Sequence, residues 1–247
     1  MISFIQFGSH WLFAFGFHVI LISVVQRLPV LTTKGWFHAG ALGTILYGCL
    51  GWNAWLAVVF YLVLGYLVTK IGFAKKQALG IAERRGGRRG PENVWGSAAT
   101  GAIIAIFIKL GFGSHELLLL GFSASFAAKL ADTFGSEIGK RWGTKTFLIT
   151  TLRAVPAGTD GGISLEGTIA SVFGSVLMTL VFSSLGLIGN SFYATIVICS
   201  GVVATLSESF VGAVFQNRLT WMSNELVNFF QTSFAALITV FGAYIFN

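Results

Sequence analysis

The chain of 247 residues is too apolar for a soluble protein, because 55% of its residues are hydrophobic, 10% are charged and its mean hydropathy is +0.79. Soluble domains carry about 25% charged residues, so the composition predicts an integral membrane protein. Uncharged runs of about twenty residues favour helices over the short alternating segments of a β-barrel. The net charge of +7 is typical of basic loops that orient a membrane protein, and we expect no nucleic-acid partner.

Apolar runs divide the chain into eight helices. The first run covers residues 1–26 without a charged side chain, and the next, 35–69, is long enough to break near 51–53 into two helices. Further helices are predicted at 94–110, 116–131, 166–189, 192–213 and 226–246. The sequence therefore predicts an all-α, polytopic bundle of about eight transmembrane helices that forms one domain over residues 1–247.

The basic residues support this number of helices. With eight crossings, residues 26–36, 70–93, 132–165 and 214–225 all form loops on one side of the membrane. These loops hold 14 of the 16 Lys and Arg residues, whereas the opposite side holds only Lys109. Such a bias predicts that the four loops are cytoplasmic, and we expect the active-site loops among them.

A first polar cluster follows the predicted fifth helix. If that helix continues, Asp132 and Lys140 lie on one stripe and Glu137 lies on the adjacent one. Gly135 and Gly139 form a pair of small residues that would let another helix approach closely. Carboxylate oxygens are ligands of the kind that hold Mg²⁺ on a substrate phosphate.

A second cluster is a glycine-rich loop that leads into the sixth helix. Residues 158–168 contain four glycines, three hydroxyl side chains and two acids. Backbone N–H groups of such a loop, together with a helix N-terminus, can bind an anion. The alternative is an ordinary turn followed by a helix cap at Ser164 or Thr168. We expect a phosphate site here, because Arg153 and other cations lie on the same membrane face.

A third cluster joins the end of helix seven to the start of helix eight. Glu208 lies inside an apolar run, which marks it as a functional candidate. Asn224, Glu225 and Asn228 follow at helical spacing, and they either bind a sugar or base or hydrogen-bond neighbouring helices. A basic loop over residues 83–93 is expected to contact anionic lipid, with a grip on a nucleoside triphosphate as the alternative.

Four segments carry a family resemblance: ADTFGSEIG at 131–139, GTDGGISLEGT at 158–168, ESFVG at 208–212 and NELVN at 224–228. They resemble the phytyl-phosphate kinase family of vitamin E (tocopherol) salvage, which includes animal transmembrane protein nineteen. A looser similarity connects them with phytol and dolichol kinases and with lipid cytidylyltransferases, membrane enzymes that use CTP.

The resemblance implies a Mg²⁺-dependent kinase that transfers the γ-phosphate of CTP or ATP, with CTP favoured, to phytyl or geranylgeranyl monophosphate. On this hypothesis Asp132, Glu137 and Asp160 hold the metal and are catalytic together with Glu208. The residues expected to bind phosphate or nucleotide are Lys140, Arg153, Gly158, Thr159, Gly161, Gly162, Ser164, Asn224, Glu225 and Asn228. The prenyl tail requires an apolar groove open to lipid between helices rich in small residues.

Two other functions remain as alternatives: a membrane cytidylyltransferase that makes a CDP-lipid, and an ion-coupled transporter. A transport path needs polar groups at mid-membrane and through to the far side, whereas those of this chain gather on one face. The expected partners are membrane lipid, a prenyl monophosphate and a nucleotide. Plant members of the family begin with a plastid transit peptide and this chain begins at its first predicted helix, so we expect a bacterial inner membrane or a cyanobacterial plasma or thylakoid membrane.

Overall fold

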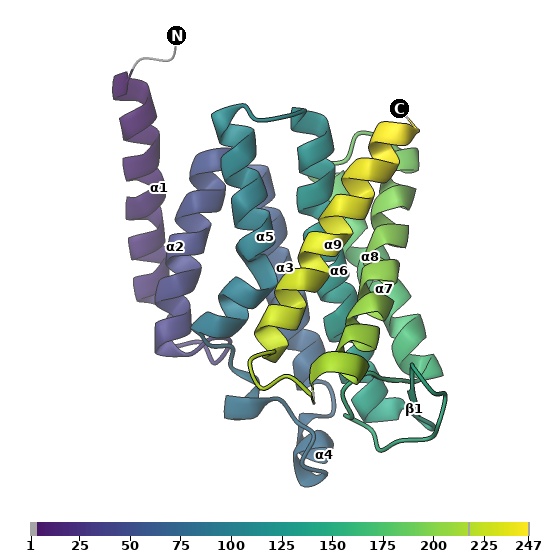
Figure 1. Cartoon of the computed structure of the whole chain (residues 1–247). Coiled ribbons are helices and arrows are strands. Elements are labelled where there is room, and N and C mark those ends of the chain that lie inside the picture. The colour runs from purple at the N-terminus through teal and green to yellow at the C-terminus, as the bar shows by residue number, and fades with distance from the viewer. Residues whose placement is uncertain (1–3, 217, 247) are drawn as a thin grey trace.

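The computed structural model describes residues 4–216 and 218–246, which form a bundle of long helices running alongside one another (Figure 1). The long helices are α1 (Phe4–Val25), α2 (Thr33–Leu50), α3 (Trp52–Lys70), α5 (Pro91–Leu110), α6 (His115–Trp142), α7 (Leu165–Ser184), α8 (Ser191–Val211) and α9 (Asn224–Ile245). The prediction of an all-α bundle of about eight helices is confirmed; residues 1–3 of the first predicted span lie outside the described residues.

Six helices, α3 and α5 to α9, are long and apolar enough to cross a membrane, and residues 10–25 of α1 form a shorter apolar stretch. The predicted break between the second and third helices lies at Gly51, whose φ of +79° interrupts the helical path. Side chains at Thr32, Ser114, Ser164 and Ser223 accept hydrogen bonds from the first turns of the helices that follow them. These caps fix where four of the helices begin.

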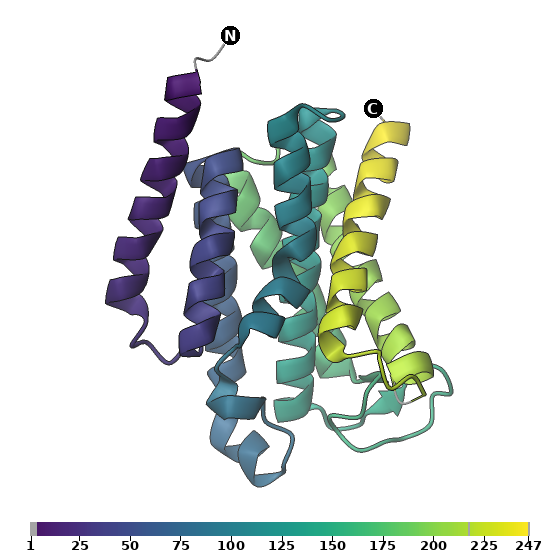
Figure 2. The same cartoon turned by 60° about the vertical axis from the view of Figure 1, so that its left-hand side comes forward.

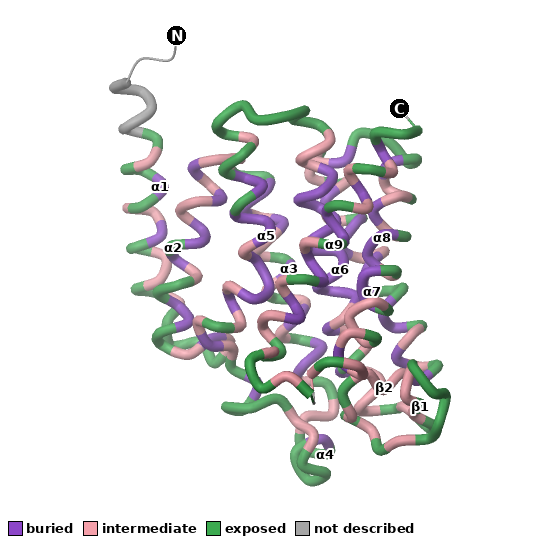
Figure 3. The backbone as a smooth tube through the Cα atoms, viewed as in Figure 1, coloured by how far each residue is buried: buried purple, intermediate pink, exposed green. Residues whose placement is uncertain are grey.

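Helix α6 is the centre of the bundle, since it packs against α3, α5, α7, α8 and α9. Buried residues run along most of its length in Figure 3, whereas α1 lies at the edge against α2 (Figure 2). Its 28 residues extend about 42 Å, which exceeds the roughly 30 Å of a bilayer core. The helix continues past the predicted end at residue 131 to Trp142, so the first part of the predicted loop 132–165 is helical.

Glycines on α6 and α7 explain why this extension is stable. The backbones meet so closely that a Cβ at Gly167 would lie 2.8 Å from the carbonyl oxygen of Gly135 and 3.4 Å from the Cα of Gly139. Gly135 and Gly139 thus form the close helix contact that their spacing predicts.

The remaining elements are short and lie at the end of the bundle away from both termini (Figure 1). They are α4 (Phe73–Ala78), the 3₁₀ turn η1 (Arg84–Gly87), the strands β1 (Phe147–Leu148) and β2 (Gly162–Ile163), and the π-helical turn η2 (Gly212–Gln216). The two strands pair antiparallel, with Phe147 opposite Ile163. This small hairpin was not predicted, and it folds the glycine-rich loop back toward the helix ends.

Candidate functional site

A cavity of about 1000 Å³ opens among the loops and helix ends at this end of the bundle. Seven of the nine acidic residues of the chain line it, together with six basic residues. The acids are Glu83, Glu92, Asp132, Glu137, Asp160, Glu208 and Glu225, and the bases are Arg84, Arg85, Arg88, Arg89, Lys129 and Lys140. Because only 10% of the chain is charged, this concentration of both signs indicates a site for a highly charged ligand.

Three helices begin at the wall of the cavity. The first turns of α5, α7 and α9 contribute Asn93, Ser164 and Asn224 to its lining. Each helix N-terminus carries a partial positive charge and N–H groups without helical partners, which favour an anion. The Ser164 hydroxyl accepts a hydrogen bond from the N–H of Gly167 at 3.1 Å, so its predicted capping role is confirmed.

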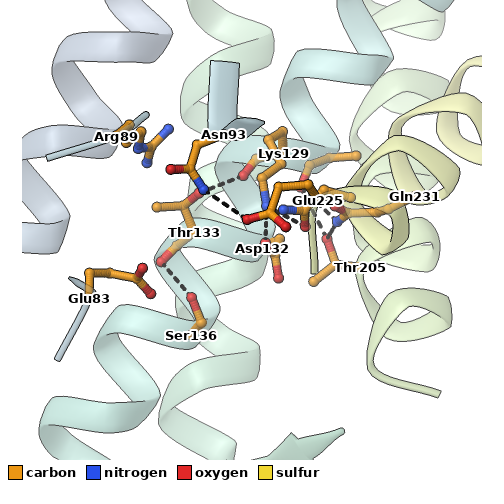
Figure 4. Close-up of polar contacts among 12 residues, drawn as sticks. Glu83, Arg89, Asn93, Lys129, Asp132, Thr133, Ser136, Thr205, Glu225 and Gln231 are labelled. Atoms are coloured by element: carbon orange, nitrogen blue, oxygen red, sulfur yellow. Dashed lines mark hydrogen bonds and ion pairs between the residues drawn. The ribbon is translucent and has the colours of Figure 1, made fainter. Parts of the chain in front are cut away.

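Lys129 of α6 lies at the centre of the polar contacts in Figure 4. It forms an ion pair with Asp132 one turn later, and its ammonium group donates a hydrogen bond to the Asn228 side chain of α9 at 2.8 Å. Asp132, Asp160 and Lys129 are all close enough to interact electrostatically with Glu208. Helices α6, α8 and α9 and the glycine-rich loop therefore bring one cation and three carboxylates into the same region.

Asn93 connects the basic loop and α5 with α9 (Figure 4). Its amide nitrogen donates to the Glu225 carboxylate at 3.2 Å. Its carbonyl oxygen accepts from the backbone N–H of Gly90 at 2.9 Å and from the guanidinium of Arg85 at 2.8 Å. The Asn93 side chain thus makes three hydrogen bonds, one of which joins the start of α5 to the start of α9.

The basic loop forms one wall of the cavity. The short helix α4, which precedes this loop, is joined to α6 by a buried ion pair between Lys76 and Glu137, whose side chains are 0% and 2% exposed. Lys76 also donates to the carbonyl oxygen of Thr69 at 2.9 Å. Farther along the loop, Glu83 pairs with Lys140 at 3.2 Å. Desolvation acts to raise the pKa of Glu83, but the charge and hydrogen bond of Lys140, together with the charges of Arg89 and Lys129, outweigh it and lower that pKa.

The glycine-rich loop reaches the cavity by passing very close to the end of α8. Gly158 and Gly161 have φ values of +85° and +74°, a region that side chains other than glycine rarely adopt. A Cβ at Gly161 would also lie 2.6 Å from the carbonyl oxygen of Ser209. Asp160 lies between these glycines, and within the described residues neither Asp160 nor Glu208 forms an ion pair.

Thirteen of the fourteen residues predicted for the site line this cavity. The exception is Arg153, which is exposed and lies outside the cavity wall, so its assignment to a phosphate is not supported by the structure. Glu137 lines the wall and forms a buried ion pair with Lys76, and its assignment as a metal ligand stays a prediction. The pair with Lys76 joins α6 to α4, the helix that leads into the basic loop.

Several cavity residues were not assigned a role from the sequence, above all Lys129. A lysine within the apolar run at the end of the predicted fifth helix was itself a signal, because charges at membrane depth are costly and usually functional. Asn93 and Thr205 gave no comparable signal, since single amides and hydroxyls are common in membrane helices.

Comparison with known proteins identifies the family. The model of the family described as integral membrane protein DUF92 matches residues 16–236. An uncharacterized membrane protein of Synechocystis sp. is 43% identical over 235 residues, which are 93% of this chain and 90% of that protein. The chloroplastic protein VTE6 of Arabidopsis thaliana is 39% identical over 230 residues, covering 89% of this chain and 68% of its own.

An uncharacterized membrane protein of Methanocaldococcus jannaschii is 32% identical over 226 residues, covering 90% of this chain and 89% of its own. No solved structure matches the chain. The chain therefore belongs to the DUF92 family of integral membrane proteins, and its resemblance to the phytyl-phosphate kinases of vitamin E salvage is confirmed.

Proposed function

We propose that the protein is a prenyl-phosphate kinase. It transfers the γ-phosphate of a nucleoside triphosphate, with CTP as the favoured donor, to phytyl or geranylgeranyl monophosphate and releases the prenyl diphosphate and a nucleoside diphosphate. The family relationship supports the class of reaction. The observation that carries the proposal is the cavity in which seven acids, six cations and three helix N-termini converge at one end of a membrane bundle.

The chemistry requires a charged cavity more than it requires a base. An oxygen of the prenyl phosphate attacks the γ-phosphorus, and the bond from that phosphorus to the β-bridging oxygen breaks. Because both reactants are anions, catalysis consists mainly of neutralising charge and aligning the groups. The attacking phosphate is already ionised near neutral pH, which is consistent with a cavity wall in which the described residues include no histidine.

The acids of the cavity fit a Mg²⁺ ion shared with the nucleotide. Protein Mg²⁺ sites commonly use one or two carboxylates, with substrate phosphates and waters as the other ligands. Within the described residues Asp160 and Glu208 form no ion pair. Asp132, which pairs with Lys129, lies within electrostatic range of Glu208. The described residues contain no group of three His, Cys, Asp or Glu side chains that could hold a metal ion, so the nucleotide phosphates and water would have to supply most of the ligands. A bound Mg²⁺ would neutralise charge on the β- and γ-phosphates.

The cations and helix ends would then position the phosphates. Lys129 and Lys140 of α6 line the charged cavity, and Arg84 and Arg88 of the basic loop line it as well. The glycine-rich loop and the start of α7 offer backbone N–H groups to the same anion. The polar side chains at the start of α9 remain for the ribose or the base. The bias of basic loops supports a cytoplasmic location for this face.

A product assay tests the proposal. Purified protein in detergent is given geranylgeranyl or phytyl monophosphate, Mg²⁺ and each nucleoside triphosphate in turn, labelled on the γ-phosphate. We expect the label in a prenyl diphosphate, most rapidly with CTP. Release of labelled pyrophosphate with transfer of the nucleotide to the lipid would instead identify a cytidylyltransferase. No turnover with any donor by folded protein would contradict the proposal.

A further inference from the structure

A second cavity, of about 90 Å³, adjoins the charged one and shares Arg89, Asn93 and Ser97 with it. It lies between α2, α3 and α5, and α2 packs against both of the other helices. Apart from the shared residues its walls are mainly apolar, and they include Leu42, Leu46, Trp55, Val58, Leu62 and Ala98. We refer to this space as the apolar groove.

The apolar groove extends from the loop end into the depth of the bundle. Its lining on α2 runs from Ala39 to Leu46, a separation of about 10 Å along the helix axis, and Leu31 in the turn before α2 lines it beside Arg89. Leu42, Leu46 and Trp55 are buried. Ala39 is only partly buried, so the groove has a margin toward the membrane. The groove thus reaches from Arg89 and Asn93 at the charged cavity to a partly exposed residue of α2.

Arg89 is fixed at the boundary between the two cavities. Its backbone exchanges hydrogen bonds with the turn before α2, donating to Val30 at 3.2 Å and accepting from Thr32 at 3.0 Å. Its guanidinium donates to the Tyr61 hydroxyl at 2.9 Å. A Cβ at Gly65 would lie 2.8 Å from the same guanidinium, so the glycine leaves room for it. The chain thus holds one cation in place where a polar cavity meets an apolar one.

We propose that the apolar groove takes the phosphate-proximal part of the prenyl chain of the acceptor, with Arg89 holding the acceptor phosphate at its mouth. This inference rests on the proposed function and specifies how its acceptor binds. An amphiphile with an anionic head joined to a hydrocarbon chain matches the charge of one cavity and the apolar walls of the other. A cavity of about 90 Å³ receives the first part of such a chain, and the rest continues past Ala39 into the bilayer.

A pair of variants on α2 tests this inference by activity. Ala39→Leu adds bulk to a groove residue, whereas Ala41→Leu adds the same bulk to an exposed residue two positions away that lines neither cavity. We expect Ala39→Leu to raise KM for geranylgeranyl monophosphate by about ten-fold, with kcat and the KM for CTP within two-fold of the unmodified protein. Equal KM values for the two variants would overturn the inference.

Photolabelling tests it without requiring turnover, so it separates failure of the groove from failure of the proposed function. A geranylgeranyl monophosphate analogue with a diazirine near its phosphate is bound to the whole protein in detergent, and labelled peptides are mapped by mass spectrometry. We expect labelling within 33–50, 52–70 or 91–98 that unlabelled geranylgeranyl monophosphate prevents. Labelling confined to other helices, or prevented equally by phosphatidylglycerol, would contradict the inference.

Discussion

The buried pair Lys76–Glu137 offers a sharp test of how the site is assembled. Lys76 belongs to the short helix α4, and Glu137 lies on α6, so the pair attaches α4, which leads into the basic loop, to the central helix. Lys76→Met keeps a side chain of similar length but removes the charge, and it leaves the Glu137 carboxylate buried without its partner. Lys75→Met is the matched control, because Lys75 is exposed.

The expected cost follows from the burial. Both side chains are almost inaccessible to solvent, at 0% and 2%, and removing one member of such a pair costs about 3–5 kcal/mol. For a protein of this size that cost corresponds to a fall in apparent Tm on the order of 10 °C. Replacing both members by methionine removes the unpaired charge, so we expect the double variant to recover most of the loss.

The variants are compared by thermal unfolding in detergent and by hydrogen exchange of residues 71–89. We expect Lys76→Met to lower the apparent Tm, to accelerate exchange in this segment and to raise the KM for the nucleotide. If Lys76→Met behaves like Lys75→Met in both measurements, the pair does not hold the basic loop. A double variant that is less stable than either single variant would also contradict the reasoning.

Three further substitutions test the cavity. Asp160→Asn is expected to lower kcat at least about 100-fold without lowering the apparent Tm. The control Glu116→Gln, at the start of α6, is expected to leave kcat unchanged. Equal kcat values for the two variants would refute a role for Asp160. Arg84→Ala is expected to raise the KM for CTP about ten-fold, whereas Arg153→Ala, outside the cavity, is expected to leave this KM unchanged. A larger KM for Arg153→Ala than for Arg84→Ala would instead support the assignment of Arg153 to a phosphate. Gly161→Ala is expected to cost about 1–3 kcal/mol of stability from its positive φ alone, measured as a lower apparent Tm, and normal stability would show that the loop can move away from α8.

The helices were predictable because the bilayer itself imposes a pattern of long apolar runs separated by charge. The same criterion failed at the end of α6. Residues from Asp132 to Trp142 are charged on part of their surface and were predicted as a loop. They remain helical because α6 extends beyond the bilayer core and is held against α7 through Gly135, Gly139 and Gly167.

The acids of the site were predictable as isolated signals, but their partners were not. Lys76 pairs with a residue 61 positions away, and Lys129 bonds to Asn228 across 99 positions, so no local spacing reveals these contacts. The basic loop was ambiguous for the same reason, since its residue Glu83 pairs with Lys140, which lies 57 positions away. Arg153 was assigned to the site because it is near the glycine-rich loop in sequence, but the structure leaves it exposed outside the cavity wall.

The role of the charged cavity as the nucleotide site is tested most directly by photolabelling with an azido derivative of CTP in the presence of Mg²⁺, followed by peptide mapping. The predicted result is label within residues 82–93, 158–164 or 223–228, lost when unlabelled CTP is added. Label on the turns 111–114 or 186–190, which lie at the opposite end of the bundle, or label that CTP fails to displace, would contradict that role.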